Sequence, residues 1–217
     1  MRIAVIGSGG REHALAWKLS QSPLCEALWA ETPVADAEPG LRPLPFAPNP
    51  SALADFCIGN GIDLVVVGPE APLAAGWADV LMERSLAVFG PTQRGARLES
   101  SKLAAKEFMQ RHGIPTAGFS VCASMADVER ELDRFATLPV IKYDGLAAGK
   151  GVAVPETREE ALAFARGAFE TGASARLLLE ERLYGPEVSM LAVTDGKTAL
   201  LLPPSRDHKR LHDGDKG

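Results

Sequence analysis

Short apolar segments that end in glycine alternate with helical segments, and this pattern constrains the fold more than any other feature. The run at 2–6 ends at Gly7, and the run at 63–67, apolar after its first residue, ends at Gly68. Strands that are apolar throughout are typical of parallel sheets covered on both faces. The alternation of strands and helices therefore predicts an α/β fold with a doubly wound parallel sheet over residues 1–90.

Local signals predict the other elements of this first part. Further strands are expected at 27–30 and 86–89, and helices at 12–19, 51–60 and 73–84. Ser51 is predicted as the N-cap of its helix, because it follows Pro50 and its hydroxyl can accept a backbone hydrogen bond. Six prolines between positions 31 and 50 predict an irregular loop.

The pattern restarts after a long helix expected at 101–112, which Gly113 and Pro115 close. The later strands are expected at 119–122, 139–142, 152–154 and 176–180, the helices at 125–135 and 157–170, and a hairpin at 191–194 and 199–202. A domain boundary is therefore expected near residues 95–120.

The composition is that of a folded protein that is mildly acidic, with 23 Lys and Arg against 28 Asp and Glu. This excess gives no electrostatic reason to bind nucleic acid, although a local basic site for a small anion remains open. Cys25, Cys57 and Cys122 are scattered, which argues against a disulfide framework or a zinc site. Without a signal-peptide pattern or a membrane-length apolar stretch, we expect a cytoplasmic protein with no membrane partner.

The first candidate site is GSGGREH, residues 7–13, between a strand and a helix. The unpaired N–H groups at a helix start attract anions, and Arg11 adds a cation suited to phosphate. A dinucleotide-binding turn is the alternative, with Glu31 near the position of the ribose-binding acid. Glu12, however, stands where that fingerprint has its third glycine. A tight turn without a ligand is the remaining alternative.

The second candidate site is Gly68-Pro69-Glu70, directly after the strand at 63–67. Ligands of open α/β sheets bind outside the carboxyl ends of the strands. Glu70 is therefore predicted to accept hydrogen bonds from sugar hydroxyls beside the phosphate held at residues 7–13. The alternative is that Pro69 ends the strand and Glu70 is solvated.

The third candidate site is VIKYDGLAAGKGV, residues 140–152. Lys142 supplies a point charge, and the small residues from 145 to 151 let backbone N–H groups fold over an anion. The spacing is one residue short of a Walker A loop and no Ser or Thr follows Lys150. A flexible hairpin without a ligand is the alternative.

The fourth candidate site is LLLEERLYGPE, residues 177–187, where an apolar strand continues as an extended linker. Such a segment offers an apolar slot with a backbone donor and acceptor, which suits adenine, and Glu187 could hold ribose hydroxyls. The alternative is that the two glutamates at the strand end are merely solvated. His208 and His212 are four residues apart, but they lack the third ligand of a zinc site.

Together these segments resemble the phosphoribosylamine–glycine ligase family of purine biosynthesis, whose members are ATP-grasp enzymes. The order of GGREHA, GPEAPL and DGLAAGKGV is far more specific than any single glycine loop. The similar segments span the chain: 4–18, 62–73, 89–92, 99–117, 140–152 and 205–217. The resemblance implies a Rossmann-like N-terminal sheet followed by an α+β ATP-grasp region that is incomplete at the C-terminus. The implied domains are a substrate-binding α/β domain at 1–95, a helical linker at 96–120, the small ATP-grasp subdomain, or lid, at 121–190 and the start of the large ATP-grasp subdomain at 191–217.

The resemblance also implies roles on the substrate side. Gly9, Gly10 and Arg11 would contact the phosphate of phosphoribosylamine, and Glu70 its ribose. The polar tail would line the phosphate and substrate region through His208, Lys209 and Arg210. Lys209 is a catalytic candidate together with Lys142.

On the ATP side, the resemblance assigns the phosphates to Lys102 and Lys142. The loop that would close over them contains Gly145, Gly149, Lys150 and Gly151. Adenine would be held by the segment from 180 to 183, that is by Glu180, Glu181 and Leu183. Glu187 would hold the ribose of the nucleotide.

The implied reaction is ATP-driven activation of glycine to glycyl phosphate, which the amine of phosphoribosylamine attacks. ATP and Mg²⁺ are the implied cofactors, with metal ligands expected beyond Gly217 and none in this chain. We expect small-molecule partners only, a monomer, and no turnover by the 217-residue chain alone. The chain departs from the family pattern at 31–40, where a Pro-Gly-Asn loop is expected, and at Tyr143 and Arg206, where Ala and Gln are common.

Overall fold

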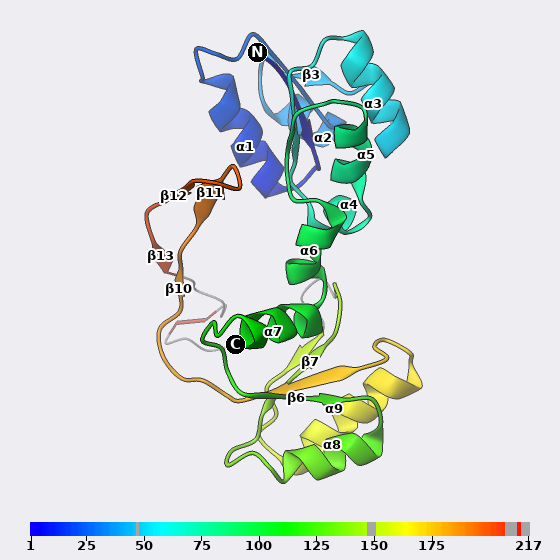
Figure 1. The fold of residues 1–217 in the computed structure, drawn as a ribbon, viewed down its shortest axis with the longest axis vertical. Helices are drawn as coiled ribbons and strands as arrows, with labels where there is room; N and C mark the ends of the chain where they lie inside the picture. The colour runs from blue at the N-terminus through cyan, green and yellow to red at the C-terminus, as the bar shows by residue number, and fades with distance from the viewer. Residues whose placement is uncertain (47, 147–150, 207–211, 214–217) are drawn as a thin grey trace.

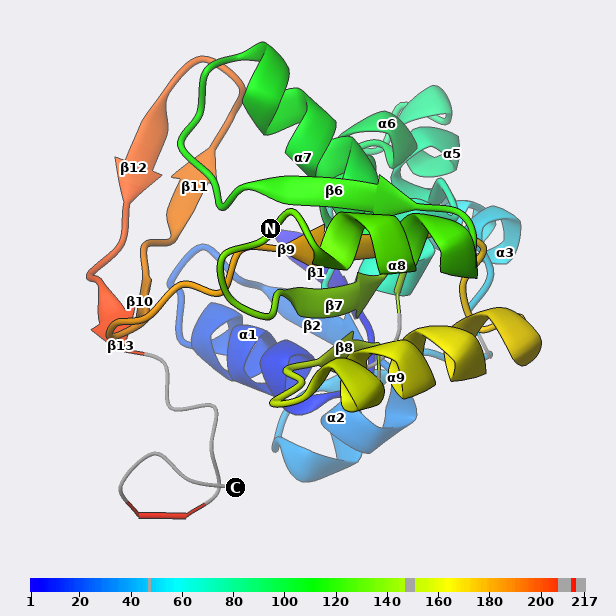
Figure 2. The same ribbon diagram turned by 90° about the horizontal axis from the view of Figure 1, so that it is seen from below.

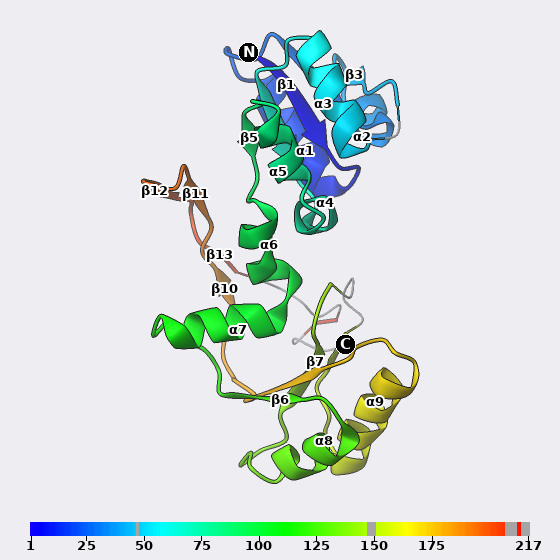
Figure 3. The ribbon, with the colours of Figure 1, turned by 45° about the vertical axis from the view of Figure 1, so that its right-hand side comes forward.

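The computed structural model describes residues 1–46, 48–146, 151–206 and 212–213. Figure 1 shows an N-terminal α/β body at one end of the long axis and a second body, built on an antiparallel sheet, at the other. Two helices connect them, α6 (Gln93–Ser100) and α7 (Lys102–Arg111). A strand-containing arm stands to one side of both bodies in Figures 1 and 3.

The N-terminal body contains a five-stranded sheet in the order β3-β2-β1-β4-β5, in which every neighbouring pair is parallel. Its strands are β1 (Arg2–Ile6), β2 (Ala27–Ala30), β3 (Arg42–Pro43), β4 (Leu64–Val67) and β5 (Val88–Phe89). The chain runs outward from β1 to β3 and then returns to place β4 on the other side of β1. This order confirms the predicted doubly wound sheet.

Helices cover both faces of this sheet, so the central strands β1, β2 and β4 are buried on two sides, whereas the edge strand β3 is exposed. Ile3 and Val5 of β1 pack towards α1 (Gly10–Ser20) and α2 (Thr32–Ala37). Ala4 and Ile6 pack towards α3 (Pro50–Gly59) and α5 (Trp77–Glu83). The continuous apolar runs in the sequence reflect this two-sided burial, because alternate residues along a strand point to opposite faces.

Three local expectations in this body are wrong. Residues 31–50 are not wholly irregular, because they contain α2 and β3. The N-cap of α3 is Asn49 rather than Ser51: its side chain accepts from the Ala52 N–H, and Pro50 begins the helix. Proline at the first helical turn needs no hydrogen-bond partner, so it starts a helix rather than breaking it. The helix expected at 73–84 is two helices, α4 (Glu70–Ala74) and α5, separated by Gly76 in a left-handed conformation.

The second body contains a four-stranded sheet in the order β6-β9-β7-β8, with antiparallel pairing throughout. The strands are β6 (Phe119–Cys122), β7 (Val140–Tyr143), β8 (Val152–Ala153) and β9 (Leu177–Glu180). One face is covered by α8 (Met125–Leu132) and α9 (Arg158–Glu170), as Figure 2 shows. The helix α7 lies on the opposite side of the sheet (Figure 1).

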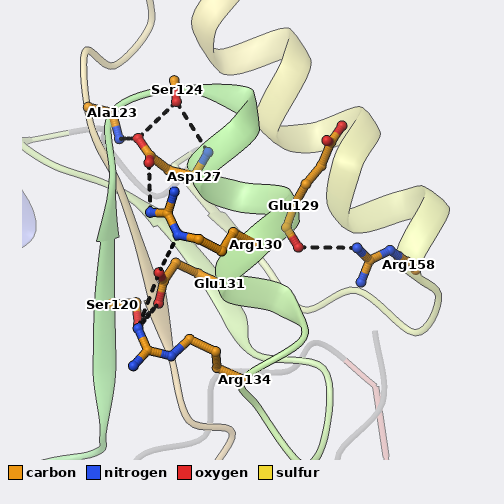
Figure 4. Close-up of polar contacts among 9 residues, drawn as sticks. All are labelled: Ser120, Ala123, Ser124, Asp127, Glu129, Arg130, Glu131, Arg134 and Arg158. Atoms are coloured by element: carbon orange, nitrogen blue, oxygen red, sulfur yellow. Dashed lines mark hydrogen bonds and ion pairs between the residues drawn. The ribbon is translucent and has the colours of Figure 1, made fainter.

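A charged network fastens α8 to β6 (Figure 4). Glu131 is buried and accepts a hydrogen bond from the Ser120 hydroxyl at 2.9 Å, while Arg130 from the helix and Arg134 from the turn after it reach its carboxylate. The Ser120 hydroxyl, followed by the arginines, lowers the pKa of Glu131 below its ordinary value. The polar pattern at 126–135 therefore includes a buried contact as well as a solvated face.

The two connecting helices are capped by the hydroxyls of Thr92 and Ser101. The sequence prediction of a helix at 101–112 includes α7 and omits α6. The sequence of α6 is mostly polar, and Ala96 is its one buried residue. Its apolar pattern was therefore too sparse to indicate a helix.

The arm spans residues 181–206 and contains four short strands. The hairpin of β11 (Ala192–Thr194) and β12 (Ala199–Leu201) confirms the expected turn at Asp195-Gly196. A second antiparallel pair joins β10 (Val188–Ser189) to β13 (Ser205–Arg206). The strands of the arm are exposed.

Candidate functional site

The first two candidate sites meet where the order of the parallel sheet reverses. β1 and β4 are neighbours, and the chain leaves β1 at Gly7 and β4 at Gly68. Each strand leads into a helix, α1 from Gly10 and α4 from Glu70. The carboxyl ends of strands at such a reversal form the ligand crevice of open α/β sheets. The sequence prediction that 7–13 and 68–70 act together agrees with this geometry.

Arg11 links the two segments directly. Its guanidinium donates to Glu70 Oε1 at 2.9 Å and to the Gly68 carbonyl at 3.2 Å. The backbone N–H of Glu70, and then Arg11, lower the pKa of the Glu70 carboxyl. Glu70 is therefore an anion at neutral pH, with oxygens suited to accept from hydroxyl groups.

Glu12 explains why this turn is not a dinucleotide fingerprint. Its side chain is buried, and its carboxylate accepts from the Gly9 N–H at 2.9 Å. A Cβ added to Gly7 would lie 2.5 Å from Glu12 Cγ, and one added to Gly68 would lie 2.6 Å from it. The space that the third glycine of the fingerprint keeps open is thus filled by Glu12. Glu31 accepts from the Gly7 N–H at 2.7 Å, so its carboxylate holds the turn.

The third and fourth candidate sites meet on the antiparallel sheet. In the pairing of β7 with β9, Lys142 stands opposite Leu178 and Val140 opposite Glu180. Lys142 and Glu180 are therefore diagonal neighbours on one face, and long side chains can span this diagonal. The Lys142 ammonium lies 2.8 Å from Glu180 Oε2. Glu180 is buried, so the alternative of a solvated glutamate is wrong for this residue.

Lys106 is a site residue that the sequence analysis missed. It projects from α7, is 6% exposed, and places its ammonium 3.3 Å from Glu180 Oε2. The same ammonium donates to Thr116 Oγ1 at 2.8 Å and to the Ala117 carbonyl at 3.1 Å. One signal was available in the sequence: Lys106 follows Leu103 by three residues and so lies on the same, buried face of the helix. A lysine on a buried face needs a partner for its charge, because unpaired lysines are almost never fully buried.

Lys102 and Asp144 join α7 to the start of the glycine-rich segment. Lys102 donates to the Gly145 carbonyl at 2.9 Å. The Asp144 carboxylate accepts from the Ser101 hydroxyl at 2.9 Å and from the Leu103 N–H at 3.2 Å. Ser101 is the N-cap of α7 and Leu103 lies in its first turn, so Asp144 caps this helix from another part of the chain. Gly145 has a φ of +114°, which favours glycine at this turn.

Two cavities adjoin at the junction of the two bodies. The larger, about 690 Å³, is lined by Lys102, Lys106, Lys142, Gly145, Glu180 and neighbouring residues. The smaller, about 390 Å³, is lined by Arg11 and Gly68 among others. Glu70 and Glu99 line both cavities. Arg11 and Lys142 therefore face neighbouring spaces with a shared wall.

Other predicted residues are placed apart from this cluster or outside the described residues. Glu181 accepts from the Gly118 N–H at 3.2 Å, and its own N–H donates to the Gly118 carbonyl. Leu183 is 68% exposed, so no apolar slot closes around it in the described part of the chain. Glu187 lies on the exposed arm, and Gly151 accepts from the Tyr143 N–H. Five predicted residues lie outside the described residues: Gly149, Lys150, His208, Lys209 and Arg210.

The described residues contain no group of three or more His, Cys, Asp or Glu side chains that could hold a metal ion. Within the same residues, no helix has the length and apolar character needed to cross a membrane. Cys25, Cys57 and Cys122 are free, and burial raises the pKa of the Cys57 and Cys122 thiols to about 11 and about 12.

Known proteins are similar in sequence to this chain over its whole length. The Ralstonia nicotianae protein named phosphoribosylamine–glycine ligase is 46% identical over 231 aligned positions, covering 100% of this chain and 53% of its own length. The chicken trifunctional purine biosynthetic protein adenosine-3 is 45% identical, covering 100% of this chain and 22% of that protein. The chain spans about half the length of the curated single-function ligases that it matches.

Solved structures show the same arrangement. The phosphoribosylamine–glycine ligase of Thermotoga maritima superposes with a TM-score of 0.78 at 31% identity, covering 100% of this chain and 53% of that one. The biotin carboxylase domain of a Hydrogenobacter thermophilus 2-oxoglutarate carboxylase, solved with MgADP, superposes with a TM-score of 0.75 at 16% identity and covers 96% and 51%. This second likeness concerns the fold alone.

Family models match the chain from end to end. The phosphoribosylglycinamide synthetase N domain matches residues 1–99, and the ATP-grasp (A) domain of the same enzyme matches residues 100–217. The glycine turn with Arg11 lies in the first match, and Lys142 with Glu180 lies in the second. The chain therefore belongs to the phosphoribosylglycinamide synthetase family.

Proposed function

We propose that this chain binds ATP and a phosphoribosyl substrate side by side, as the part of a phosphoribosylamine–glycine ligase that brings the two together. The observation that carries the proposal is the pair of adjoining cavities, one with three lysines and one with Arg11, that share Glu70 and Glu99. Each cavity contains at least one cation for a phosphate, and ligands bound in the two cavities would lie next to one another across the shared wall.

On the sugar side, the phosphate would lie at the start of α1, near Gly10 and Arg11. The first N–H groups of a helix have no partner within the helix and favour an anion. The Gly9 N–H already donates to Glu12, so it orders the turn. Glu70 would accept from the ribose hydroxyls, which is consistent with its anionic state.

On the nucleotide side, the polyphosphate would lie between Lys102 and Lys142. Both side chains line the larger cavity. Within the part of the chain that the structure describes, Lys102 donates to the Gly145 carbonyl and Lys142 to Glu180 Oε2. The glycine-rich segment that starts at Gly145 would cover the phosphates from above. Adenine and ribose would extend along residues 180–187, as the family resemblance implies.

In the proposed reaction, a glycine carboxylate oxygen attacks the γ-phosphorus of ATP and the bond to ADP breaks. The amine nitrogen of phosphoribosylamine then attacks the acyl carbon of glycyl phosphate. Inorganic phosphate leaves and the amine loses a proton. Lys102 and Lys142 would contribute by neutralising the charge of the transferred group, which is the main demand of phosphoryl transfer.

Mg²⁺ would add to this neutralisation when bound to the polyphosphate. The described residues contain no group of three or more His, Cys, Asp or Glu side chains that could hold it, so no step is assigned to a metal site among them. We also infer that the protein works as a monomer in the cytoplasm. Its three free cysteines, two of them buried, are consistent with a reducing compartment.

The test is calorimetric titration with ATP and, separately, with ribose 5-phosphate. Lys142→Ala is expected to weaken ATP binding about tenfold or more, equivalent to about 1.4 kcal/mol, while ribose 5-phosphate binding is unchanged. Arg11→Ala is expected to show the reverse pattern. Lys18→Ala, an exposed lysine that lines neither cavity, is the control. Equal losses of both ligands in either site variant would contradict the proposal.

A further inference from the structure

Glu180 is shared by two lysines that differ in how firmly they are held. Its Oε2 atom lies 2.8 Å from the Lys142 ammonium and 3.3 Å from the Lys106 ammonium. The Lys106 side chain is 7% exposed and the Lys142 side chain 28% exposed. One carboxylate oxygen thus compensates two cations on the wall of the larger cavity.

The two lysines differ in the number of contacts that hold their ammonium groups. The Lys106 ammonium has three oxygen neighbours, on Glu180, Thr116 and Ala117, which satisfy its three donors. Among the residues that the structure describes, Glu180 is the one hydrogen-bond partner of Lys142. Lys142 can therefore leave Glu180 by breaking a single contact, whereas Lys106 cannot move without losing three.

Lys142 can move away from Glu180 only if another cation compensates the buried carboxylate, and Lys106 is that cation. A buried carboxylate that loses its cation is strongly destabilised, commonly by several kcal/mol. With Lys142 as its one counter-ion, Glu180 would hold that lysine back from any ligand. Because Lys106 stays beside the same oxygen, Glu180 remains compensated when Lys142 turns into the cavity.

We propose that Lys106 is a positioning residue that keeps Glu180 charge-compensated, so that Lys142 can exchange Glu180 for a polyphosphate. The identity of that anion rests on the proposed function, but the competition between the two lysines for Glu180 does not. Lys106 therefore acts on the ligand through Glu180 and Lys142.

The competition predicts opposite effects of two substitutions on Lys142. Lys106→Met leaves Glu180 with Lys142 alone, so Lys142 is held more tightly. Glu180→Gln removes the carboxylate charge, so Lys142 is released. If Lys106 only filled space, its loss would loosen the wall and expose Lys142, as the Glu180 change does.

The experiment measures the acylation rate of individual lysines by an amine-reactive reagent, read by mass spectrometry on the ligand-free folded chain. We expect Lys142 to react about threefold or more slowly in Lys106→Met and about threefold or more quickly in Glu180→Gln, because a paired ammonium is protected from acylation. Lys106→Arg is expected to restore the wild-type rate. The exposed Lys18 and Lys197 are internal controls whose rates stay constant.

A faster or unchanged rate at Lys142 in Lys106→Met would overturn the inference. Lys106→Gln, which retains a donor but no charge, is the second variant if the methionine variant does not fold, and the same directions are expected. Inorganic tripolyphosphate is then added: it should protect Lys142 in the wild type and several-fold less in Lys106→Gln, and equal protection would also overturn the inference. A wild type that binds tripolyphosphate but not ATP would contradict the proposed function alone.

Discussion

The two adjoining cavities, here called the two sides of the cleft, each contain a carboxylate paired with a cation, but the two carboxylates differ in burial. On the sugar side, Glu70 and Arg11 form one ion pair, with side chains that are 41% and 59% exposed. On the nucleotide side, Glu180 is 9% exposed and pairs with Lys106 and Lys142. Both carboxylates follow or end a strand and both face a cavity. Comparing the two pairs separates the contribution of an ion pair to folding stability from its contribution to ligand binding.

Burial decides which contribution dominates. An exposed pair adds little stability because water competes for both charges, so Arg11 can leave Glu70 for a phosphate at small cost. A buried pair has lost its water, and removing one partner leaves a charge that nothing compensates. We therefore expect the nucleotide side to be sensitive to folding defects and the sugar side to lose ligand binding without losing stability.

The largest effect should follow from removing Glu180. Glu180→Ala is expected to lower the free energy of unfolding by about 3–5 kcal/mol, because the buried Lys106 loses its counter-ion. Glu70→Ala, the matched change on the sugar side, is expected to cost at most about 1 kcal/mol. Urea unfolding monitored by circular dichroism measures both values. Similar losses in the two variants would break the comparison.

The next largest effect on stability is expected at Gly68, against which the Glu12 side chain packs. A Cβ at Gly68 would lie 2.6 Å from Cγ of the buried Glu12, which the Gly9 N–H holds in place. Gly68→Ala is therefore expected to lower the free energy of unfolding by about 1–3 kcal/mol through overpacking. Gly167→Ala is the control, since it lies within α9 with no atom within 4 Å of the added Cβ, and should stabilise slightly. A stable Gly68→Ala variant would show that Glu12 moves easily.

Asp144 has intermediate burial and should have an intermediate effect. Its side chain is 13% exposed and accepts from the hydroxyl of Ser101, the N-cap of α7, and from the Leu103 N–H in the first turn. Asp144→Ala is expected to cost about 1–2 kcal/mol of unfolding free energy, as loss of a helix cap does. Asp144→Asn keeps one acceptor oxygen and should recover part of the loss. No loss in the alanine variant would show that the Ser101 hydroxyl alone caps α7.

The sequence predicted the parts of the fold that depend on local pattern. The apolar runs at 2–6 and 63–67 and the turn at Asp195-Gly196 predicted their strands and hairpin correctly. Prolines misled the analysis at 31–50, because Pro33 lies in the first turn of α2 rather than in a loop. Proline signals a boundary without saying whether a helix ends or begins there.

The candidate site was predictable where its residues lie in motifs and unpredictable where packing brings them together. Arg11 and Glu70 follow strands, so their meeting could be inferred from parallel-sheet topology. Lys142 and Glu180 lie on one face because of the register of β7 with β9, which the structure shows and the sequence pattern does not. Lys106 reaches Glu180 only because α7 packs over that face, and no local pattern shows where a helix will pack. Lys106 was therefore missed although its own helix was predicted.

The smallest effect concerns the pH dependence of the exposed pair. The pKa of Glu70 in the folded chain is below the ordinary value of 4.5, first because of its backbone N–H and then because of Arg11. A lowered folded pKa stabilises the fold above the ordinary value, and this stabilisation is lost as the pH falls through the folded pKa. The difference in unfolding free energy between wild type and Glu70→Gln should therefore be constant above about pH 5.5, remain below about 1 kcal/mol because the pair is exposed, and shrink below about pH 4.5. Urea titrations of both proteins across this pH range measure the difference. A difference that grew on acidification would mean that Glu70 is destabilised as an anion, and the contrast between the two sides of the cleft would then rest on local charge rather than on burial.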